Sequence, residues 1–125
     1  MIYNKDKGYK LRFYNNARTG EKPVEKYLEK LDIKEQSKVA KFIEFLRLSA
    51  CCFNQPFIKH IRGKMWELKV DFSHNKYRLF YFIFIKKTII ILHIFRKKTA
   101  KTPKLEISTA EKRHHEVLEN KQIYE

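Results

Sequence analysis

Residues 65–95 carry a hydrophobic period of two that is interrupted only by two short turns, and no other feature constrains the fold as strongly. In "MWELKVDF" every second side chain, from Trp66 to Phe72, is apolar. The segments "KYRLFYFIFI" and "TIIILHIF" follow, after turns at "SHN" and at Lys86–Lys87. This pattern predicts a three-stranded antiparallel meander. The later two strands are apolar on most positions, as expected if helices cover one face and something else partly covers the other.

Two helices are predicted upstream of the meander. Pro23 suits the first position of a helix, because its missing N–H would be unpaired there. Apolar residues then recur at i, i+3, i+4 and i+7 through residues 24–31. Asp32 and Glu35 have the spacing of a capping box, which predicts the start of a second helix that ends near 50–53.

A strand over residues 9–15 opens the chain, and Pro103 can start a last helix with Ile107 and Ala110 on one side. The order of elements predicts an α+β fold: a small antiparallel β-sheet with two N-terminal helices packed on one face and a C-terminal helix. The length of 125 residues, without a Pro/Gly/Ser-rich linker, predicts one domain over 1–125.

The positive charge is concentrated in one part of the chain. The formal net charge is +14, and residues 59–104 hold 13 Lys/Arg against 2 Asp/Glu. No acidic residue occurs between Asp71 and Glu106, whereas residues 105–125 carry a small negative excess. Such a segment favours a polyanion as partner, meaning nucleic acid, an anionic membrane or an acidic protein. The alternative is an ordinary solvated surface in a lysine-rich chain.

Other features bear on compartment. The start "MIYNKDKGYK" has no apolar core of a signal peptide, and the longest apolar runs are far shorter than the ~20 residues of a membrane-spanning helix. The two cysteines, Cys51 and Cys52, are adjacent and have no metal-ligand spacing. They are interpreted as small apolar side chains at a helix end in a reducing compartment. We therefore expect a cytoplasmic protein that does not bind membranes.

Several kinds of catalytic site lack support in the sequence. No His/Asp/Glu cluster has metal-ligand spacing, no carboxylate pair lies in the basic half, and the three glycines form no phosphate loop. We expect neither a metal nor another cofactor. Guanidinium and ammonium groups can bind a phosphate and stabilise the charge that builds up during its transfer. Such a site needs a nucleophile from the substrate, which RNA supplies with its 2′-OH.

Three motifs resemble the RelE/HigB superfamily of bacterial toxins, specifically its phage-derived branch. They are "MWELK" at 65–69, "YRLFYF" at 77–82 and "LHIFRKKTAKTP" at 92–103, with "TGEKPVEKYLEKL" similar to the first helix of that branch. The resemblance implies a RelE-like fold and a type II toxin–antitoxin system. It further implies an mRNA interferase, a metal-independent endoribonuclease that inhibits translation by cleaving mRNA on the ribosome. A cognate antitoxin, a small helix-turn-helix protein of the HigA type, would neutralise it.

The resemblance also implies site residues. Arg78 matches the arginine that faces the scissile phosphate in such toxins, and we expect it to be exposed. Lys97 and Lys98 match the "KK" pair that would stabilise charge, and His93 would assist proton transfer. Lys69 stands where the branch often has Arg, so a point charge replaces a bidentate fork. Predicted to hold the RNA backbone are Lys59, Arg62, Lys64, Lys69, Arg96, Lys101 and Lys104.

Structural interpretations stay open beside these roles. Arg78 could be a structural arginine at the sheet edge, His93 a satisfied core histidine, and Lys97 and Lys98 a solvated surface. Trp66 and the phenylalanines of the meander are predicted to be core. The protein could also be a poison without ribonuclease activity, such as the gyrase inhibitors of the related ParE branch, or an RNA-binding module that has lost catalysis.

Overall fold

A computed structural model describes residues 8–49 and 55–125 of the chain. The fold is α+β, as predicted, with a five-stranded sheet in the order β1-β5-β4-β3-β2. The strands are β1 (Lys10–Phe13), β2 (Ile58–Arg62), β3 (Met65–Phe72), β4 (Asn75–Phe84) and β5 (Thr88–Arg96). The helices are α1 (Pro23–Lys30), α2 (Ile33–Leu48) and α3 (Lys104–Glu119), followed by a short 3-10 turn, η2 (Lys121–Ile123).

Strands β3, β4 and β5 form the predicted antiparallel meander. Ser73 at the first turn, and Lys86 and Lys87 at the second, adopt positive φ angles of 55°, 56° and 53°. Turns with positive φ match the right-handed twist of the flanking strands, which explains how such short connections close the hairpins. Strand β2 adds a fourth antiparallel strand beside β3.

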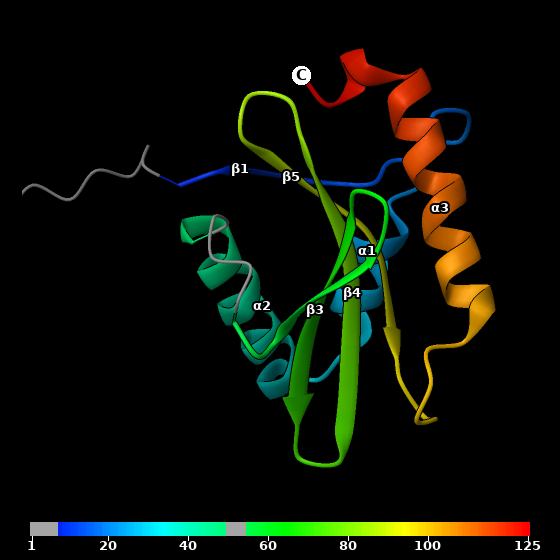
Figure 1. Cartoon of the computed structure of the whole chain (residues 1–125). Helices are drawn as coiled ribbons and strands as arrows, with labels where there is room; N and C mark the ends of the chain where they lie inside the picture. Colours follow the sequence, from blue (N-terminus) through cyan, green and yellow to red (C-terminus); the bar gives the residue numbers. More distant parts are fainter. Residues whose placement is uncertain (1–7, 50–54) are drawn as a thin grey trace, which may run out of the picture.

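The edge strand β1 makes the sheet mixed. It pairs in parallel with β5, with Lys10 opposite Thr88 and Phe13 opposite Ile91. The period-two pattern predicted β1 as a strand, but the pattern holds no information on its partner. Figure 1 shows β1 beside β5, and the strand order places β2, the next strand in the chain, at the opposite edge of the sheet.

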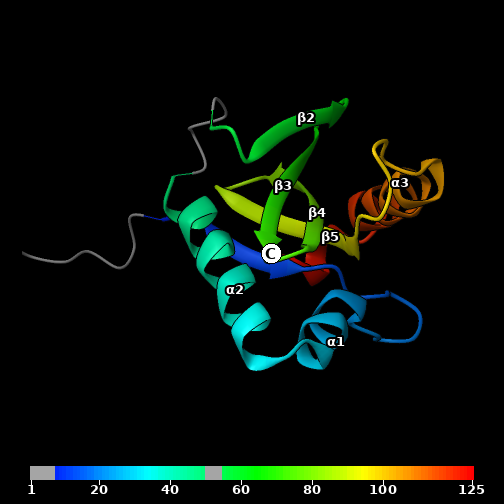
Figure 2. The ribbon, with the colours of Figure 1, turned by 90° about the horizontal axis from the view of Figure 1, so that it is seen from below.

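The sheet separates two hydrophobic cores. On one face α1 and α2 pack through Val24, Val39 and Leu46, and on the other face α3 packs through Ala110 and Val117. Figure 2, viewed along the sheet, shows α1 and α2 on one side and α3 on the other. The two N-terminal helices on one face are thus confirmed. The covering of both faces explains why β4 and β5 are apolar on most positions.

The N-terminus of α2 follows half of the predicted capping box. The Glu35 amide donates to the Asp32 carboxylate at 2.9 Å, as in a regular N-cap. The Glu35 side chain, however, accepts hydrogen bonds from the side-chain amide of Asn75, at 3.0 Å, and from the Tyr77 hydroxyl. The Glu35 carboxylate therefore binds side chains of β4 and does not cap the helix as it would in a capping box. It connects α2 to β4.

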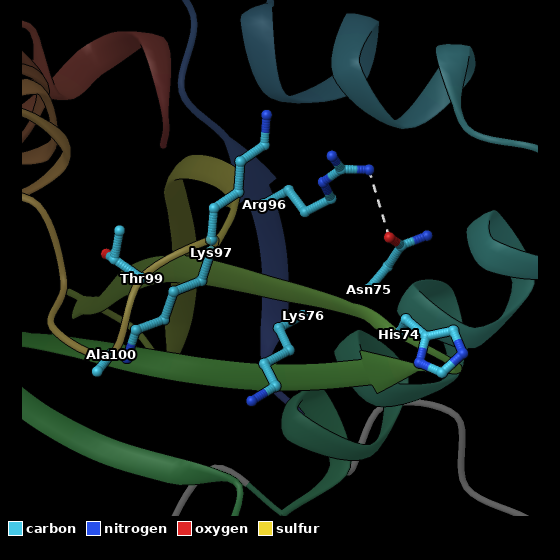
Figure 3. A pocket seen from close by; sticks show the side chains of 8 residues that line it. His74, Asn75, Lys76, Arg96, Lys97, Thr99 and Ala100 are labelled. Carbon is cyan, nitrogen blue, oxygen red and sulfur yellow. Dashed lines mark hydrogen bonds between the residues drawn. The ribbon is translucent and has the colours of Figure 1, made fainter.

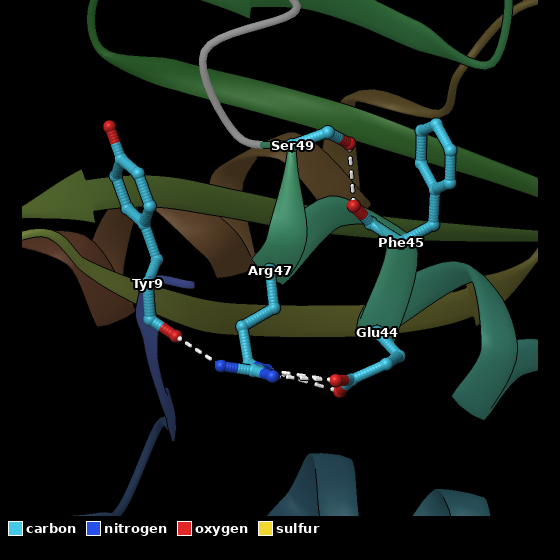
Figure 4. A network of polar contacts seen from close by, with 5 residues as sticks. All are labelled: Tyr9, Glu44, Phe45, Arg47 and Ser49. Atoms are coloured by element: carbon cyan, nitrogen blue, oxygen red, sulfur yellow. Dashed lines mark hydrogen bonds and ion pairs between the residues drawn. The ribbon is translucent and has the colours of Figure 1, made fainter. Parts of the chain in front are cut away.

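At its other end α2 holds the start of the chain. The Arg47 guanidinium donates to the Tyr9 carbonyl at 3.2 Å and pairs with Glu44, and the Tyr9 amide donates to the Arg47 carbonyl at 2.9 Å (Figure 4). The helix ends at Leu48, with Ser49 donating back to Phe45. Cys51 and Cys52, predicted at this helix end, lie outside the described residues.

Helix α3 is attached to the β1–α1 connection by polar contacts. The Glu116 carboxylate accepts from the Tyr14 hydroxyl at 2.6 Å and from the Ala17 amide at 2.8 Å. The Arg113 guanidinium lies over the Tyr14 ring, 4.9 Å from its centroid, and donates to the Leu92 carbonyl. These contacts fix α3 against β5 and the β1–α1 connection.

Candidate functional site

Cross-strand pairing gathers basic side chains on the sheet face that α3 partly covers. Lys59 of β2 lies opposite Glu67 of β3, and Lys69 of β3 lies opposite Arg78 of β4. Direct partners share a face, and Glu67 and Lys69 are two residues apart, so all four point to the same side. That side is the α3 side, because the strand partner of Glu67 on β4 is Phe80, a member of the α3 core.

Lys97 joins this group at the end of β5. Its amide donates to the Lys76 carbonyl at 2.7 Å, which extends the β4–β5 ladder by one residue. The preceding residue, Arg96, pairs with Tyr77 of the α1/α2 core and therefore points to the opposite face. We call four of the cations on the α3 side the basic face: Lys59, Lys69, Arg78 and Lys97.

The charges of the basic face act on one another. Burial lowers the pKa of Lys97, and the nearby charges of Arg78, Lys59 and Lys69 lower it further, whereas the Glu67 carboxylate raises it. A lysine surrounded by other cations holds its proton less tightly, and an approaching anion would relieve the repulsion. The face is therefore suited to bind a phosphate.

Arg78 is buried, contrary to the expected exposed arginine. Only 6% of the residue is exposed, and its Nη1 donates to Asp71 Oδ1 and to the Tyr77 carbonyl, both at 2.9 Å. Its Nε is buried and has no hydrogen-bond partner in the part of the chain that the structure describes. The position between Lys69 and Phe95 on the neighbouring strands explains the burial. Asp71 fixes one end of the guanidinium and leaves the Nε donor unused.

A hollow of about 550 Å³ adjoins the basic face at the ends of β4 and β5 (Figure 3). Arg96 donates to the side-chain carbonyl of Asn75 at 3.3 Å across this hollow. Lys97 belongs to both the basic face and the hollow, so the two form a continuous basic surface. The hollow is lined by His74, Asn75, Lys76, Arg96, Lys97, Lys98, Thr99 and Ala100.

His93 lies under α3 rather than on the open part of the face. Its Nδ1 accepts from Arg113 at 3.2 Å, and its Nε2 is 3.0 Å from the Glu106 carboxylate. A neutral ring with the proton on Nε2 satisfies both contacts. Burial lowers the pKa of His93, the Glu106 hydrogen bond raises it, and the Arg113 charge lowers it again. The imidazole is half-buried with both nitrogens engaged, as in the core-histidine interpretation.

The other predicted RNA-binding residues are not all brought together. Lys101 and Lys104 are exposed after the segment that leaves β5, as is Lys98, which was predicted to stabilise charge in the reaction. Arg62 pairs with Glu111 of α3 at 3.1 Å, and Lys64 is in the β2–β3 turn. These two residues lie at the end of β3 opposite the hollow, so the predicted strip is divided between the two ends of the sheet.

Several polar residues near the basic face were not predicted as site residues, among them Glu67, Asp71 and Asn75. Asp71 and Glu67 stood out in the sequence as the only acids of the basic half. The hairpin register, with Asp71 opposite Lys76 and two residues from the Lys69–Arg78 pair, is the signal that could have identified Asp71 as the arginine's partner.

The described residues, 8–49 and 55–125, hold no group of three or more His, Cys, Asp or Glu side chains placed to bind a metal ion. In the same residues no helix has the length and apolar character needed to cross a membrane.

The model of one protein family, described as phage derived protein Gp49-like (DUF891), matches residues 26–115. The chain belongs to this family. The Gp49-like family is a phage-derived, toxin-like family of toxin–antitoxin systems, and membership implies a cognate antitoxin as partner. The matched residues include the whole basic face and the hollow of this Gp49-like protein. No curated protein matches the chain.

Proposed function

We propose that this Gp49-like protein is the toxin of a type II toxin–antitoxin pair and cleaves mRNA on the translating ribosome, as its resemblance to the RelE/HigB toxins implies. The observation that carries the proposal is the convergence of Lys59, Lys69, Arg78 and Lys97 on one face of the sheet, beside a basic hollow. Membership of a toxin-like family supports it independently.

In the proposed reaction the RNA supplies its own nucleophile. The 2′-OH gives up its proton to solvent, and O2′ attacks the adjacent phosphorus while the bond from phosphorus to O5′ breaks. The departing O5′ takes up a proton from solvent, so the products are a 2′,3′-cyclic phosphate upstream and a 5′-OH downstream. The positive charge of the Arg78 guanidinium and the ammonium of Lys97 stabilise the charge on the phosphate oxygens, and Lys98 adds a further cation at the hollow.

The remaining cations have binding roles in this proposal. Lys59 and Lys69 hold the RNA backbone on the basic face, and Arg96, Lys101 and Lys104 hold the strand that leaves through the hollow. Arg62 and Lys64, at the other end of β3, contact ribosomal RNA or a distant part of the message. Proton transfer by His93 would need a free ring nitrogen, but Arg113 and Glu106 of α3 contact both of them. In this proposal His93 therefore holds α3 in place and transfers no proton.

The end groups of the fragments test the reaction. Purified protein is incubated with programmed ribosomes whose mRNA carries, in parallel reactions, an unmodified, a 2′-deoxy or a 2′-O-methyl nucleotide at the cleaved position. The unmodified message should give a 2′,3′-cyclic phosphate and a 5′-OH, and both modified messages should bind and stay intact. Both lack the nucleophile but keep the phosphate charge.

Other results would identify a competing function. Fragments with a 3′-OH and a 5′-phosphate would mean that activated water attacks the phosphate. Intact mRNA in all reactions, together with growth inhibition in cells, would favour a poison such as a gyrase inhibitor. Intact mRNA without growth inhibition would favour a binding module.

A further inference from the structure

A second basic hollow lies at the edge of the sheet, and neither the predicted site nor the proposed reaction uses it. It has a volume of about 480 Å³ and is formed by the start of β1, the end of α2 and the turn between β4 and β5. Five of its eight lining residues are Lys or Arg, and none is Asp or Glu. We call it the second hollow, and its cations are Lys10, Arg12, Arg47, Lys86 and Lys87.

The second hollow is far from the basic face. Lys86 and Lys87 precede the first residue of β5, whereas Lys97 follows its last residue. The nine residues of β5 rise about 3.3 Å each, so the two groups of cations are roughly 30 Å apart. Figure 1 shows the β4–β5 turn and the last residues of β5 at opposite ends of the sheet. A phosphate bound at the second hollow is therefore not the one that Lys97 contacts in the proposed reaction.

Arg47 forms a fixed wall of the second hollow. Its guanidinium pairs with the Glu44 carboxylate at 2.7 Å and donates to the Tyr9 carbonyl at 3.2 Å (Figure 4). A Cβ at Gly8 would lie only 2.5 Å from Nη1 of Arg47, so the absence of a side chain there lets the guanidinium lie against the backbone. Glu44 largely balances the charge of Arg47, and the other four cations give the second hollow its net charge.

Those four cations have no acidic partner. The Lys10 amide donates to the Lys87 carbonyl at 2.9 Å, which brings β1 beside the turn, and Arg12 lies two residues further along the same side of β1. All four side chains are exposed, and none makes an ion pair within 4.0 Å among the described residues. Glu125 lines a smaller adjoining hollow with Lys10 and Lys86 but pairs with neither. Their positive charge is therefore available to a ligand.

The turn that carries Lys86 and Lys87 has a backbone that does not favour lysine. Both residues have positive φ angles, 56° and 53°. A side chain raises the energy of this left-handed conformation, and Gly and Asn are the preferred residues there. The chain nevertheless has lysine at both positions, side by side. Two charges kept at some cost in stability indicate a role in binding and not in folding.

The chemistry of the second hollow fits the phosphates of an RNA duplex. Lys and Arg side chains bind a phosphate backbone whatever its sequence. Proteins that bind single strands add aromatic side chains on which bases stack, whereas duplex RNA is recognised through its phosphates and 2′-OH groups. Among the described residues that line the second hollow, Tyr9 is the one aromatic residue and is half-buried. A protein partner would need an apolar centre for its interface, and the lining offers only Tyr9 and the half-buried Leu11.

We propose that the second hollow binds the backbone of double-stranded RNA, separately from the strand at the basic face. On a ribosome, the folded ribosomal RNA supplies such duplexes. The inference goes beyond the proposed cleavage and does not depend on it, because a duplex would bind at this edge whether or not the basic face cleaves mRNA.

Salt-dependent binding of a short fluorescein-labelled RNA duplex, measured by fluorescence anisotropy, tests the proposal. The variant Lys86→Asn/Lys87→Gly removes two charges and gives the turn residues that its φ angles favour. It should bind the duplex more weakly, and the slope of log Kd against log salt concentration should fall by about 2, roughly 1 for each phosphate contact. The same variant should unfold at a higher urea concentration than the wild type, so weaker binding would not be due to unfolding.

The matched control is Lys34→Gln/Lys41→Gln, which removes two exposed charges from α2 and should leave the slope nearly unchanged. Equal falls in the two double variants would show that binding follows net charge alone. A turn variant that is less stable than the wild type would make its lysines structural. Either result would overturn the proposal.

Other ligands test the kind of partner. Single-stranded RNA of the same sequence should lose less of its salt slope in the turn variant than the duplex does, and an equal loss would refute the assignment to a duplex. Weaker binding of polyglutamate or of phosphatidylserine vesicles, with duplex binding unchanged, would identify an acidic protein or a membrane as the partner instead. If the wild type cleaves no mRNA but the turn variant loses duplex binding, the second hollow is supported and the proposed ribonuclease is rejected.

Discussion

Replacement of Arg78 by Met separates the catalytic from the structural interpretation of this arginine. Met roughly matches the length of the buried side chain but removes its charge and its donors. Loss of one preorganised donor to the developing charge typically costs about 2.7–4 kcal/mol, or 10²–10³ in rate. We therefore expect a fall of at least about a hundredfold in cleavage of mRNA on programmed ribosomes.

The expected loss of stability is smaller. Arg78 gives up a hydrogen bond to Asp71, whose side chain is 61% exposed and can be rehydrated, and one to the Tyr77 carbonyl. Hydrogen bonds made by a charged group contribute about 1.5–3 kcal/mol each. An apolar replacement also removes the cost of burying the guanidinium charge, which offsets part of this loss. Against a usual free energy of unfolding of roughly 5–15 kcal/mol, the variant should stay folded.

Two comparisons make the test of Arg78 decisive. Arg18→Met, in the β1–α1 connection, removes the same charge from an exposed position and should keep both activity and stability. Arg78→Lys should recover part of the activity, because it restores a charge without the guanidinium fork. The reasoning fails if Arg78→Met is folded by urea unfolding and cleaves mRNA within about tenfold of the wild type, since tenfold corresponds to only ~1.4 kcal/mol.

Two contacts between helices and the sheet give further predictions: His93 with Glu106 of α3, and Glu35 of α2 with β4. Because the pKa of His93 is lowered in the folded state, the unfolded chain binds its proton at higher pH, so the free energy of unfolding should fall as the pH drops below about 6.5. His93→Asn should flatten that fall in urea unfolding at a series of pH values, and an unchanged slope would contradict the assignment. Glu35→Ala should cost about 1–3 kcal/mol of unfolding free energy, because it leaves the buried Tyr77 hydroxyl and the Asn75 amide without their acceptor. Cleavage should fall less than in Arg78→Met, and an equal fall would mean that the hollow beside Asn75 is part of the reaction site.

The sequence alone predicted those strands and helices whose positions depend on neighbouring residues. The period of two and the turn positions placed β3, β4 and β5, because alternation and turn chemistry depend on adjacent residues. Pro23 and Asp32 located the starts of α1 and α2 for the same reason. Short-range patterns could not predict the parallel pairing of β1 with β5, which depends on residues far apart in the chain.

The candidate site was predictable in its residue types but not in its geometry. The motif around Arg78 indicated a phosphate-binding arginine, yet its burial depends on two neighbouring strands and its partner Asp71 on the hairpin register. Likewise His93 gains its contacts from α3, which is reached only after the basic segment. The register of the sheet also separated Arg96 from Lys97, since adjacent residues on a strand point to opposite faces.

The parallel pairing of β1 with β5 has a consequence for folding during synthesis of the chain. Lys10 of β1 cannot pair until its partner Thr88, which lies 78 positions later in the chain, has been synthesised. At a synthesis rate of 5–20 residues per second, that interval lasts roughly 4–16 s. Lys97, which completes the basic face, is translated only after the whole of β5. The nascent chain therefore spends most of its synthesis without β5 in the sheet and without the complete basic face.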